Sequence, residues 1–188
     1  KDDKWLLIIV IITAIFGIVM IYSASFIWAD YKFNDPFKFV KAQSAFFIMS
    51  LLLVFILRKI NPKIYYEKAN LILLICFILL VLVLIPGLGK IRNGSRSWFG
   101  IGGFGIQPSE FAKIGLIIYV SKYLANNNRI ITDVKKGVFP VLFVIGVFFF
   151  LIMLEPDFGT AMVIVITLVS ILFISGVKLS FFIKIGLL

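Results

Sequence analysis

The chain alternates between long apolar runs and short polar segments. Each apolar run is close to the length of about 20 residues that a helix needs to cross the hydrocarbon core of a membrane. The runs predict six spans, near residues 5–29, 40–57, 69–88, 108–124, 137–154 and 158–177. After Lys178 the sequence becomes apolar again and predicts the start of a seventh span. The pattern therefore predicts an all-α integral membrane fold, a polytopic transmembrane helix bundle that is incomplete and forms a single membrane domain over residues 1–188.

The composition excludes the soluble alternatives. Hydrophobic residues make up 62% of the 188 residues and only 15% are charged, whereas about a quarter of a soluble domain is charged. A soluble domain of this length would bury only about two thirds of its unfolded surface. This chain lacks the polar residues that would have to cover the remainder, so it is neither a soluble enzyme nor a disordered tail.

The basic residues predict an orientation in the membrane. The formal net charge is +10, which in a soluble protein would favour nucleic acid as a partner. In a membrane protein, Lys and Arg gather instead in cytoplasmic loops, and we expect no nucleic acid partner. With the N-terminus in the cytoplasm, the inner segments hold twice as many basic residues as the outer ones. The predicted multi-pass topology therefore places residues 58–68 inside and residues 87–107 outside.

Two residue types limit the chemistry of the chain. There is no histidine, which excludes histidine as a catalytic base, metal ligand or pH switch in this stretch. The single cysteine, Cys76, lies inside an apolar run and has no partner for an intrachain disulfide. We therefore expect Cys76 to be a core residue rather than a redox centre.

The predicted fourth span begins with Gln107-Pro108-Ser109-Glu110, in which proline and an acid suit the first turn of a helix. Lys113 follows Glu110 by one turn, so both side chains lie on one helix face. One interpretation is a local ion pair between a helix-start acid and a lysine that reaches the interface. The other is a polar cavity entered from outside, where Lys113 meets a phosphate that Glu110 helps to orient.

Glu155, Pro156 and Asp157 form almost the whole connection between the fifth and sixth predicted spans. This short turn places two carboxyl groups at the edge of the membrane. Asp157 could cap the helix that starts at Phe158. Alternatively, the two carboxylates could hold a divalent cation or direct an acceptor sugar.

The predicted outer loop combines polar residues, a tryptophan and several glycines. Asn93 and Gly94 indicate a turn, Arg96 offers a guanidinium to a phosphate, and Trp98 suits an interfacial anchor or a substrate contact. Asn93 also begins a glycosylation sequon. Residues 100–105 match the glycine pattern of dinucleotide-binding proteins, but that pattern has meaning only between a strand and a helix of a βαβ unit. We expect a flexible glycine loop at the membrane surface instead.

Four segments, taken together, resemble one family, the SEDS proteins (shape, elongation, division and sporulation) of the FtsW, RodA and SpoVE type. The segments are Tyr22-Ser-Ala-Ser25, Asn93-Gly-Ser-Arg-Ser-Trp98, Gln107-Pro-Ser-Glu-Phe-Ala-Lys113 and Pro156-Asp-Phe-Gly-Thr-Ala161. The resemblance covers the whole chain, and the outer loop and the stretch Ala29-Asp-Tyr-Lys32 are closer to the FtsW and SpoVE branch than to RodA. The resemblance implies substrate-binding or cavity positions at Asn93, Arg96, Trp98, Gln107, Ser109, Glu110, Lys113, Asp157 and Thr160.

The resemblance also implies an activity. SEDS proteins of this type are peptidoglycan glycosyltransferases that polymerise lipid II at the outer face of the bacterial cytoplasmic membrane, in cell division or in sporulation septum synthesis. The implied partners are a class B penicillin-binding protein, which is a transpeptidase, and other division or sporulation membrane proteins. This stretch requires no cofactor, although its carboxylates are compatible with a divalent cation. The resemblance implies a catalytic aspartate beyond Leu188, so we expect this chain alone to be inactive.

Two positions depart from the family pattern, and two other functions also fit the sequence. The family usually has Gln at the position of Glu155 and Leu at the position of Phe158. A flippase that transports lipid-linked precursors would also place polar residues in a helix bundle, and a non-catalytic scaffold that recruits division partners is a third alternative. A transporter would place its binding groups near the midplane of the membrane. The candidate residues here gather at one predicted face, which favours the enzyme.

Overall fold

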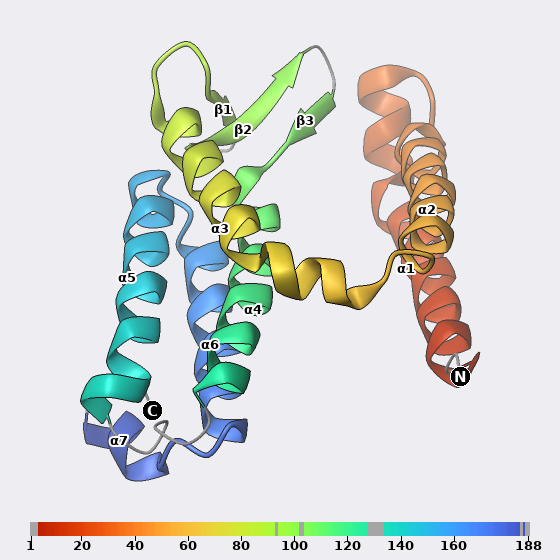
Figure 1. The fold of residues 1–188 in the computed structure, drawn as a ribbon. Helices are drawn as coiled ribbons and strands as arrows, with labels where there is room; N and C mark the ends of the chain where they lie inside the picture. Colours follow the sequence, from red (N-terminus) through yellow and green to blue (C-terminus); the bar gives the residue numbers. More distant parts are fainter. Residues whose placement is uncertain (1–3, 93, 102–103, 128–133, 185, 187–188) are drawn as a thin grey trace. The chain divides into compact units, whose positions relative to one another are not determined.

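The computed structural model describes residues 4–92, 94–101, 104–127, 134–184 and 186, most of which are helical (Figure 1). Contacts divide the chain into two compact units, residues 1–61 and 62–188. The elements, in chain order, are α1 (Lys4–Phe33), α2 (Lys38–Leu57), α3 (Pro62–Leu84), β1 (Lys90–Arg92), β2 (Ser95–Ile101), β3 (Phe104–Ile106), α4 (Pro108–Asn126), a π-helical turn (Val134–Val138), α5 (Phe139–Leu154), α6 (Phe158–Ile174) and α7 (Leu179–Lys184).

The first unit is a pair of helices, α1 and α2, joined by a short turn. Asp35 organises this turn, since its carboxylate accepts a hydrogen bond from the Phe37 backbone N–H at 3.1 Å and pairs with the Lys41 ammonium at 3.0 Å. The Tyr22 ring stacks on the Phe37 ring with 5.2 Å between centroids. This contact packs α1 against the residue that precedes α2.

In the second unit, helices α3 to α6 pack around one apolar core, with the sheet at one end and α7 at the other (Figure 1). Each helix contributes buried residues spaced three or four positions apart, which is the period of one helix face. In a membrane, close packing holds such helices together, because lipid is as apolar as the core itself. The core residues include Cys76 and Leu80 on α3; Ala112, Leu116 and Val120 on α4; Val141, Ile145, Phe148 and Ile152 on α5; and Ala161, Ile164, Leu168 and Leu172 on α6.

Helices α3 and α4 approach each other closely at Gly115. A Cβ atom at this position would lie 2.8 Å from the Sγ atom of Cys76, too close for any larger residue to fit without movement. The Cys76 thiol also donates a weak hydrogen bond to the Phe111 backbone carbonyl oxygen at 3.5 Å. Cys76 is therefore a free, buried packing residue, and the predicted core position is confirmed.

A small antiparallel sheet with the strand order β1-β2-β3 connects α3 to α4. The prediction of a flexible glycine loop is wrong for the described part of this segment, because Gly100 and Gly105 pair with each other across β2 and β3. Gly102 and Gly103 lie outside the described residues. The strands form an antiparallel hairpin rather than a βαβ unit, which agrees with the rejection of a dinucleotide site. The sheet is a small β element in a chain predicted to be all-α.

Among the described residues, four helical segments are long and apolar enough to cross a membrane: Lys4–Phe33, Lys38–Leu57, Pro62–Leu84 and Lys136–Leu154. α6 is apolar but shorter, and α7 is a short helix where the seventh span was expected, so the count of six spans and part of a seventh stays a prediction. α3 begins well before residue 69 and ends before residue 88. Pro62 suits its first turn, and Glu67 and Lys68 are tolerated there because long charged side chains reach the interface.

Candidate functional site

Polar side chains of the second unit gather at the end that carries the sheet. α4 and α6 both begin at this end, and the α5–α6 turn, residues 155–157, lies beside them (Figure 1). The first turn of a helix has backbone N–H groups without helical partners, so it favours hydrogen-bond acceptors and negative charge. This end of the unit is therefore suited to hold carboxylates and anionic ligands.

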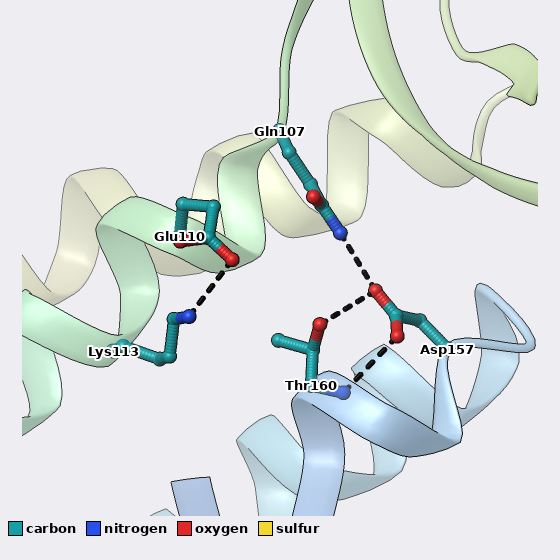
Figure 2. Close-up of polar contacts among 5 residues, drawn as sticks. All are labelled: Gln107, Glu110, Lys113, Asp157 and Thr160. Carbon is teal, nitrogen blue, oxygen red and sulfur yellow. Dashed lines mark hydrogen bonds and ion pairs between the residues drawn. The ribbon is translucent and has the colours of Figure 1, made fainter. Parts of the chain in front are cut away.

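Asp157 connects the two helix starts. Its Oδ1 atom accepts a hydrogen bond from the Thr160 backbone N–H at 3.1 Å and so caps α6. Its Oδ2 atom accepts hydrogen bonds from the Thr160 hydroxyl at 2.8 Å and from the Gln107 side-chain amide at 2.6 Å. Figure 2 shows Gln107 and Asp157 reaching toward each other from the two helix starts. The predicted cap is confirmed, and the same carboxylate also joins α4 to α6.

Glu110 and Lys113 form an ion pair along α4, with 2.8 Å between Nζ and Oε1 (Figure 2). The Glu110 side chain is 53% exposed, whereas the Lys113 side chain is only 26% exposed. An exposed ion pair contributes only about 0–1 kcal/mol, so pairing alone is a weak reason for a lysine at this depth. Lys113 also lines a cavity of about 40 Å³ between α4 and α6, with Ile117, Ile164, Thr167 and Leu168.

Glu155 is fully buried, and neither of its carboxyl oxygens has a hydrogen-bond partner in the described part of the chain. Burial, and then the nearby negative charge of Asp157, raise the pKa of Glu155 to about 8. The carboxyl group therefore carries a proton at neutral pH. A protonated Glu155 has the same charge as Gln, so this departure from the family pattern does not add the charge that the sequence suggests.

The Ser95 hydroxyl ties the sheet to the α5–α6 turn by donating a hydrogen bond to the Glu155 backbone carbonyl oxygen. The Ser95 and Ser97 hydroxyls are 2.8 Å apart, and Ser97 is buried. Sequence reasoning missed both serines as site residues. A usable signal was present, because Ser95 and Ser97 alternate with Arg96 and Trp98, as residues on opposite faces of a strand do.

The remaining predicted residues are less connected. Ser109 is fully buried and its hydroxyl has no hydrogen-bond partner among the residues described. Arg96 and Trp98 lie on β2, and no hydrogen bond or ion pair given by the described residues joins them to the Asp157 contacts. Asn93 lies outside the described residues. Within the described ranges no three His, Cys, Asp or Glu residues converge on a metal position, and a divalent cation stays a prediction.

These features define a class, a multi-pass membrane helix bundle with a polar group at one end. The sequence matches the family described as cell cycle protein (FTSW_RODA_SPOVE) over residues 3–188, and the chain belongs to this family. It is 41% identical to Stage V sporulation protein E of Bacillus subtilis (strain 168) over 188 residues, which is all of this chain and 51% of that protein. It is 36% identical over 181 residues to the probable peptidoglycan glycosyltransferase FtsW of Legionella pneumophila, covering 96% of this chain and 46% of that protein.

Solved structures resemble the fold as well. One belongs to a peptidoglycan synthase complex, described as coordinating polymerization and crosslinking, with a TM-score of 0.71 and 27% identity over 93% of this chain and 50% of that chain. Another is the rod shape determining protein RodA of Thermus thermophilus, with a TM-score of 0.68 and 29% identity over 88% of this chain and 54% of that chain. The SEDS resemblance is confirmed, and the chain spans about half the length of these relatives.

Proposed function

We propose that the complete protein is a peptidoglycan glycosyltransferase that polymerises lipid II at the outer face of the bacterial cytoplasmic membrane, for cell division or for synthesis of the sporulation septum. The names of the relatives support this function, since one is a stage V sporulation protein and others are named as peptidoglycan glycosyltransferases. The chain spans about half their length, so the proposal concerns the complete protein.

The position of Lys113 is the observation that carries the proposal. Lys113 lines the small cavity between α4 and α6, and its ammonium pairs with Glu110 on α4, whose start Gln107 and Asp157 hold to the start of α6 (Figure 2). Sugar transfer from a lipid-linked pyrophosphate produces an anionic leaving group, and a positioned cation stabilises that charge as it develops. The cavity beside Lys113 has room for about one water molecule, so we place the pyrophosphate at its mouth and the sugars outside it.

Asp157 is a positioning residue in this proposal. Thr160 and Gln107 already donate three hydrogen bonds to its carboxylate, so both of its oxygens are engaged in holding the two helix starts. By joining the two helix starts, it fixes the distance between α6 and the helix that carries Lys113. The family resemblance implies a catalytic aspartate beyond Leu188.

The location of these contacts supports an enzyme more than a transporter. The hydrogen bonds of Asp157 and the Glu110–Lys113 pair lie at the starts of α4 and α6. A transporter commonly builds its binding site from interrupted helices near the bilayer midplane. Groups at one end of the bundle suit a reaction that takes place at one membrane surface.

We further propose that the complete protein works with a class B penicillin-binding protein, a transpeptidase that crosslinks the new strands. The match to a chain of a peptidoglycan synthase complex supports this partnership. Copurification of the full-length protein with the transpeptidase from the same organism tests it. Separation of the two proteins under conditions in which each remains folded would contradict it.

Loss of the Lys113 ammonium tests the proposed function. In the full-length protein, purified and supplied with lipid II, Lys113→Ala should lower glycan polymerisation about 100-fold, since removal of one positioned electrostatic contact commonly costs about 10²–10³ in rate. Gel separation of the polymer measures the effect. Lys122→Ala is the matched control, because Lys122 also lies on α4 but contacts the Glu67 backbone carbonyl oxygen at the other end. Near-wild-type polymer from Lys113→Ala, or equal loss in both variants, would contradict the proposal.

A further inference from the structure

The sheet between α3 and α4 carries three cationic residues, Lys90, Arg92 and Arg96, and no acidic residue. The nearest acids along the sequence are Glu67 and Glu110, and none of the ion pairs in the described part of the chain involves a cation of the sheet. Lys and Arg normally accumulate on the cytoplasmic side of membrane proteins. The positive-inside tendency therefore does not explain the basic residues of a segment that is predicted to lie outside. Binding of an anionic ligand would explain them.

Arg92 and Trp98 form a stacked pair on one face of the sheet. The guanidinium carbon of Arg92 lies 4.9 Å from the centroid of the Trp98 ring. The guanidinium also occupies the space that a side chain at Gly105 would enter, since a Cβ atom there would lie 2.9 Å from it. Trp98 is the cross-strand partner of Lys90, which places a second cation beside the pair. The absence of a side chain at Gly105 thus permits a fixed cationic and aromatic surface.

Ser95 and Ser97 lie on the face opposite Trp98, because side chains alternate along a strand. Arg92 is the cross-strand partner of Ser95 beyond an irregularity in the pairing, and its guanidinium reaches the Trp98 ring and the space beside Gly105. The face with Ser95 and Ser97 packs on the helix bundle, where Ser97 is buried and Ser95 donates a hydrogen bond to the α5–α6 turn. Arg96 and Trp98 therefore point away from the turn. The cationic face is directed away from the polar contacts of Asp157.

Exposed apolar side chains accompany these cations. Leu88, Ile91 and Ile106 are 52%, 62% and 59% exposed, and each lies in the sheet or in the turn that leads into it. The sheet follows α3, which is long and apolar enough to cross a membrane, so it lies where hydrocarbon gives way to headgroups. Cationic, aromatic and apolar side chains together are characteristic of elements that bind this interface.

We propose that the sheet is a binding site for anionic phospholipid headgroups, with Lys90 and Arg92 contacting phosphate oxygens and Trp98 entering the boundary between headgroups and acyl chains. The guanidinium of Arg92 suits a phosphate because its donors match two oxygens at once. Stacking on Trp98 orients these donors before the lipid arrives, which lowers the entropy lost on binding. The proposal does not depend on glycosyl transfer, since it concerns a surface apart from the Asp157 contacts.

The test measures phospholipid binding to the purified full-length protein. Native mass spectrometry counts bound phosphatidylglycerol over a titration in detergent, with phosphatidylcholine as the lipid without net charge. The double variant Lys90→Gln/Arg92→Gln should bind phosphatidylglycerol about 25-fold more weakly, because each cation near an anionic surface contributes about fivefold. Binding of phosphatidylcholine should not change, and added salt should reduce the difference between the two proteins.

Two further variants make the result decisive. Lys59→Gln/Lys68→Gln removes the same charge from the segment predicted to lie inside and should retain tight phosphatidylglycerol binding. Lys90→Arg/Arg92→Lys preserves both charges and should retain most of the affinity, which guards against a folding defect. Unchanged binding in the sheet variant, or equal weakening in both Gln variants, would overturn the proposal. If Lys90→Gln/Arg92→Gln lost binding of a lipid-linked pyrophosphate but kept phosphatidylglycerol binding, the proposal would be overturned. The sheet would then be part of the substrate-binding site.

Discussion

At the scale of single residues, the α5–α6 turn contains two carboxyl groups in different surroundings. Asp157 accepts three hydrogen bonds from Thr160 and Gln107. Glu155 is buried without a hydrogen-bond partner among the described residues, and its pKa is raised to about 8. Two residues apart, one carboxyl group accepts three hydrogen bonds, whereas burial keeps the other protonated at neutral pH.

Glu155 should make stability depend on pH. The folded protein holds the Glu155 proton up to about pH 8, whereas the unfolded chain releases it near pH 4.5. The stability that this group contributes is therefore complete below about pH 4.5 and is lost as the pH rises to about 8, with about 1.4 kcal/mol for each pH unit between them. Glu155→Gln should be more stable than the wild type at pH 8 and should show a flatter profile. Thermal unfolding of the purified full-length protein at several pH values measures this difference.

The same substitution has a functional expectation. Because a protonated Glu155 and a Gln carry the same charge, Glu155→Gln should retain polymerisation at neutral pH. If the stability of the wild type and of Glu155→Gln changed with pH in the same way, the carboxyl group of Glu155 would be ionised in the folded protein and the stability prediction would be wrong. A large loss of polymer in Glu155→Gln would assign the carboxyl group a direct role.

Asp157→Asn should distinguish the two roles of Asp157, which are capping α6 and joining α6 to the start of α4 through Gln107. Asn caps a helix about as well as Asp, so the Thr160 N–H contact should persist. The amide nitrogen of Asn cannot accept the hydrogen bonds that the Gln107 amide and the Thr160 hydroxyl donate to Oδ2. Loss of each bond should cost about 0.5–1.5 kcal/mol. We expect lower polymerisation at normal membrane abundance. Measuring polymer yield and protein level together tests this expectation. Full activity of Asp157→Asn would show that Asp157 only caps α6.

At the scale of helices and strands, the contact between α3 and α4 depends on one glycine. Gly115→Ala would bring a Cβ atom to within 2.8 Å of the Cys76 Sγ atom, and such overpacking typically costs about 1–3 kcal/mol. Cys76→Ala should rescue most of this loss, because it removes the atom that clashes. Gly146→Ala is the control, since a Cβ atom there would meet nothing within 4 Å. Thermal unfolding of the wild type, the two single variants Gly115→Ala and Cys76→Ala, and the double variant Gly115→Ala/Cys76→Ala forms a double-mutant cycle. Additive effects would contradict the contact.

Most of the helices could be predicted from the sequence, and there are physical reasons why the sheet and the start of α3 could not. Uncharged runs give helices because lipid requires every backbone group to be bonded within the segment. The sheet was missed because Gly100 and Gly105 suggest a loop, while their pairing depends on a partner strand. The start of α3 was missed because Glu67 and Lys68 interrupt the apolar run. The Gln107–Asp157 contact joins residues 50 positions apart, and no local pattern contains that information.

At the scale of the whole molecule, orientation in the membrane is the main open prediction. Intact cells carrying single cysteines in a Cys76→Ala background should be labelled from outside at Lys90→Cys and not at Lys63→Cys. The reason is that basic residues concentrate in the segments assigned to the cytoplasm. A reagent that cannot cross the membrane, followed by labelling after lysis, measures both sites. Labelling at position 63 alone would show that the orientation is the opposite of the predicted one. The polar contacts of Asp157 would then lie at the cytoplasmic face.

The neutral state of Glu155 also has an evolutionary consequence. Codons for Glu and Gln differ only in their first base, so a single mutation exchanges the two residues. Because Glu155 is protonated below about pH 8, this exchange leaves the charge of the turn unchanged in neutral surroundings, and selection on charge has little to act on. With the turn at the outer face, as the predicted topology places it, strongly alkaline surroundings would ionise a Glu at this position against its burial. Lineages from alkaline habitats should therefore retain Gln, whereas lineages from neutral habitats are free to drift between the two.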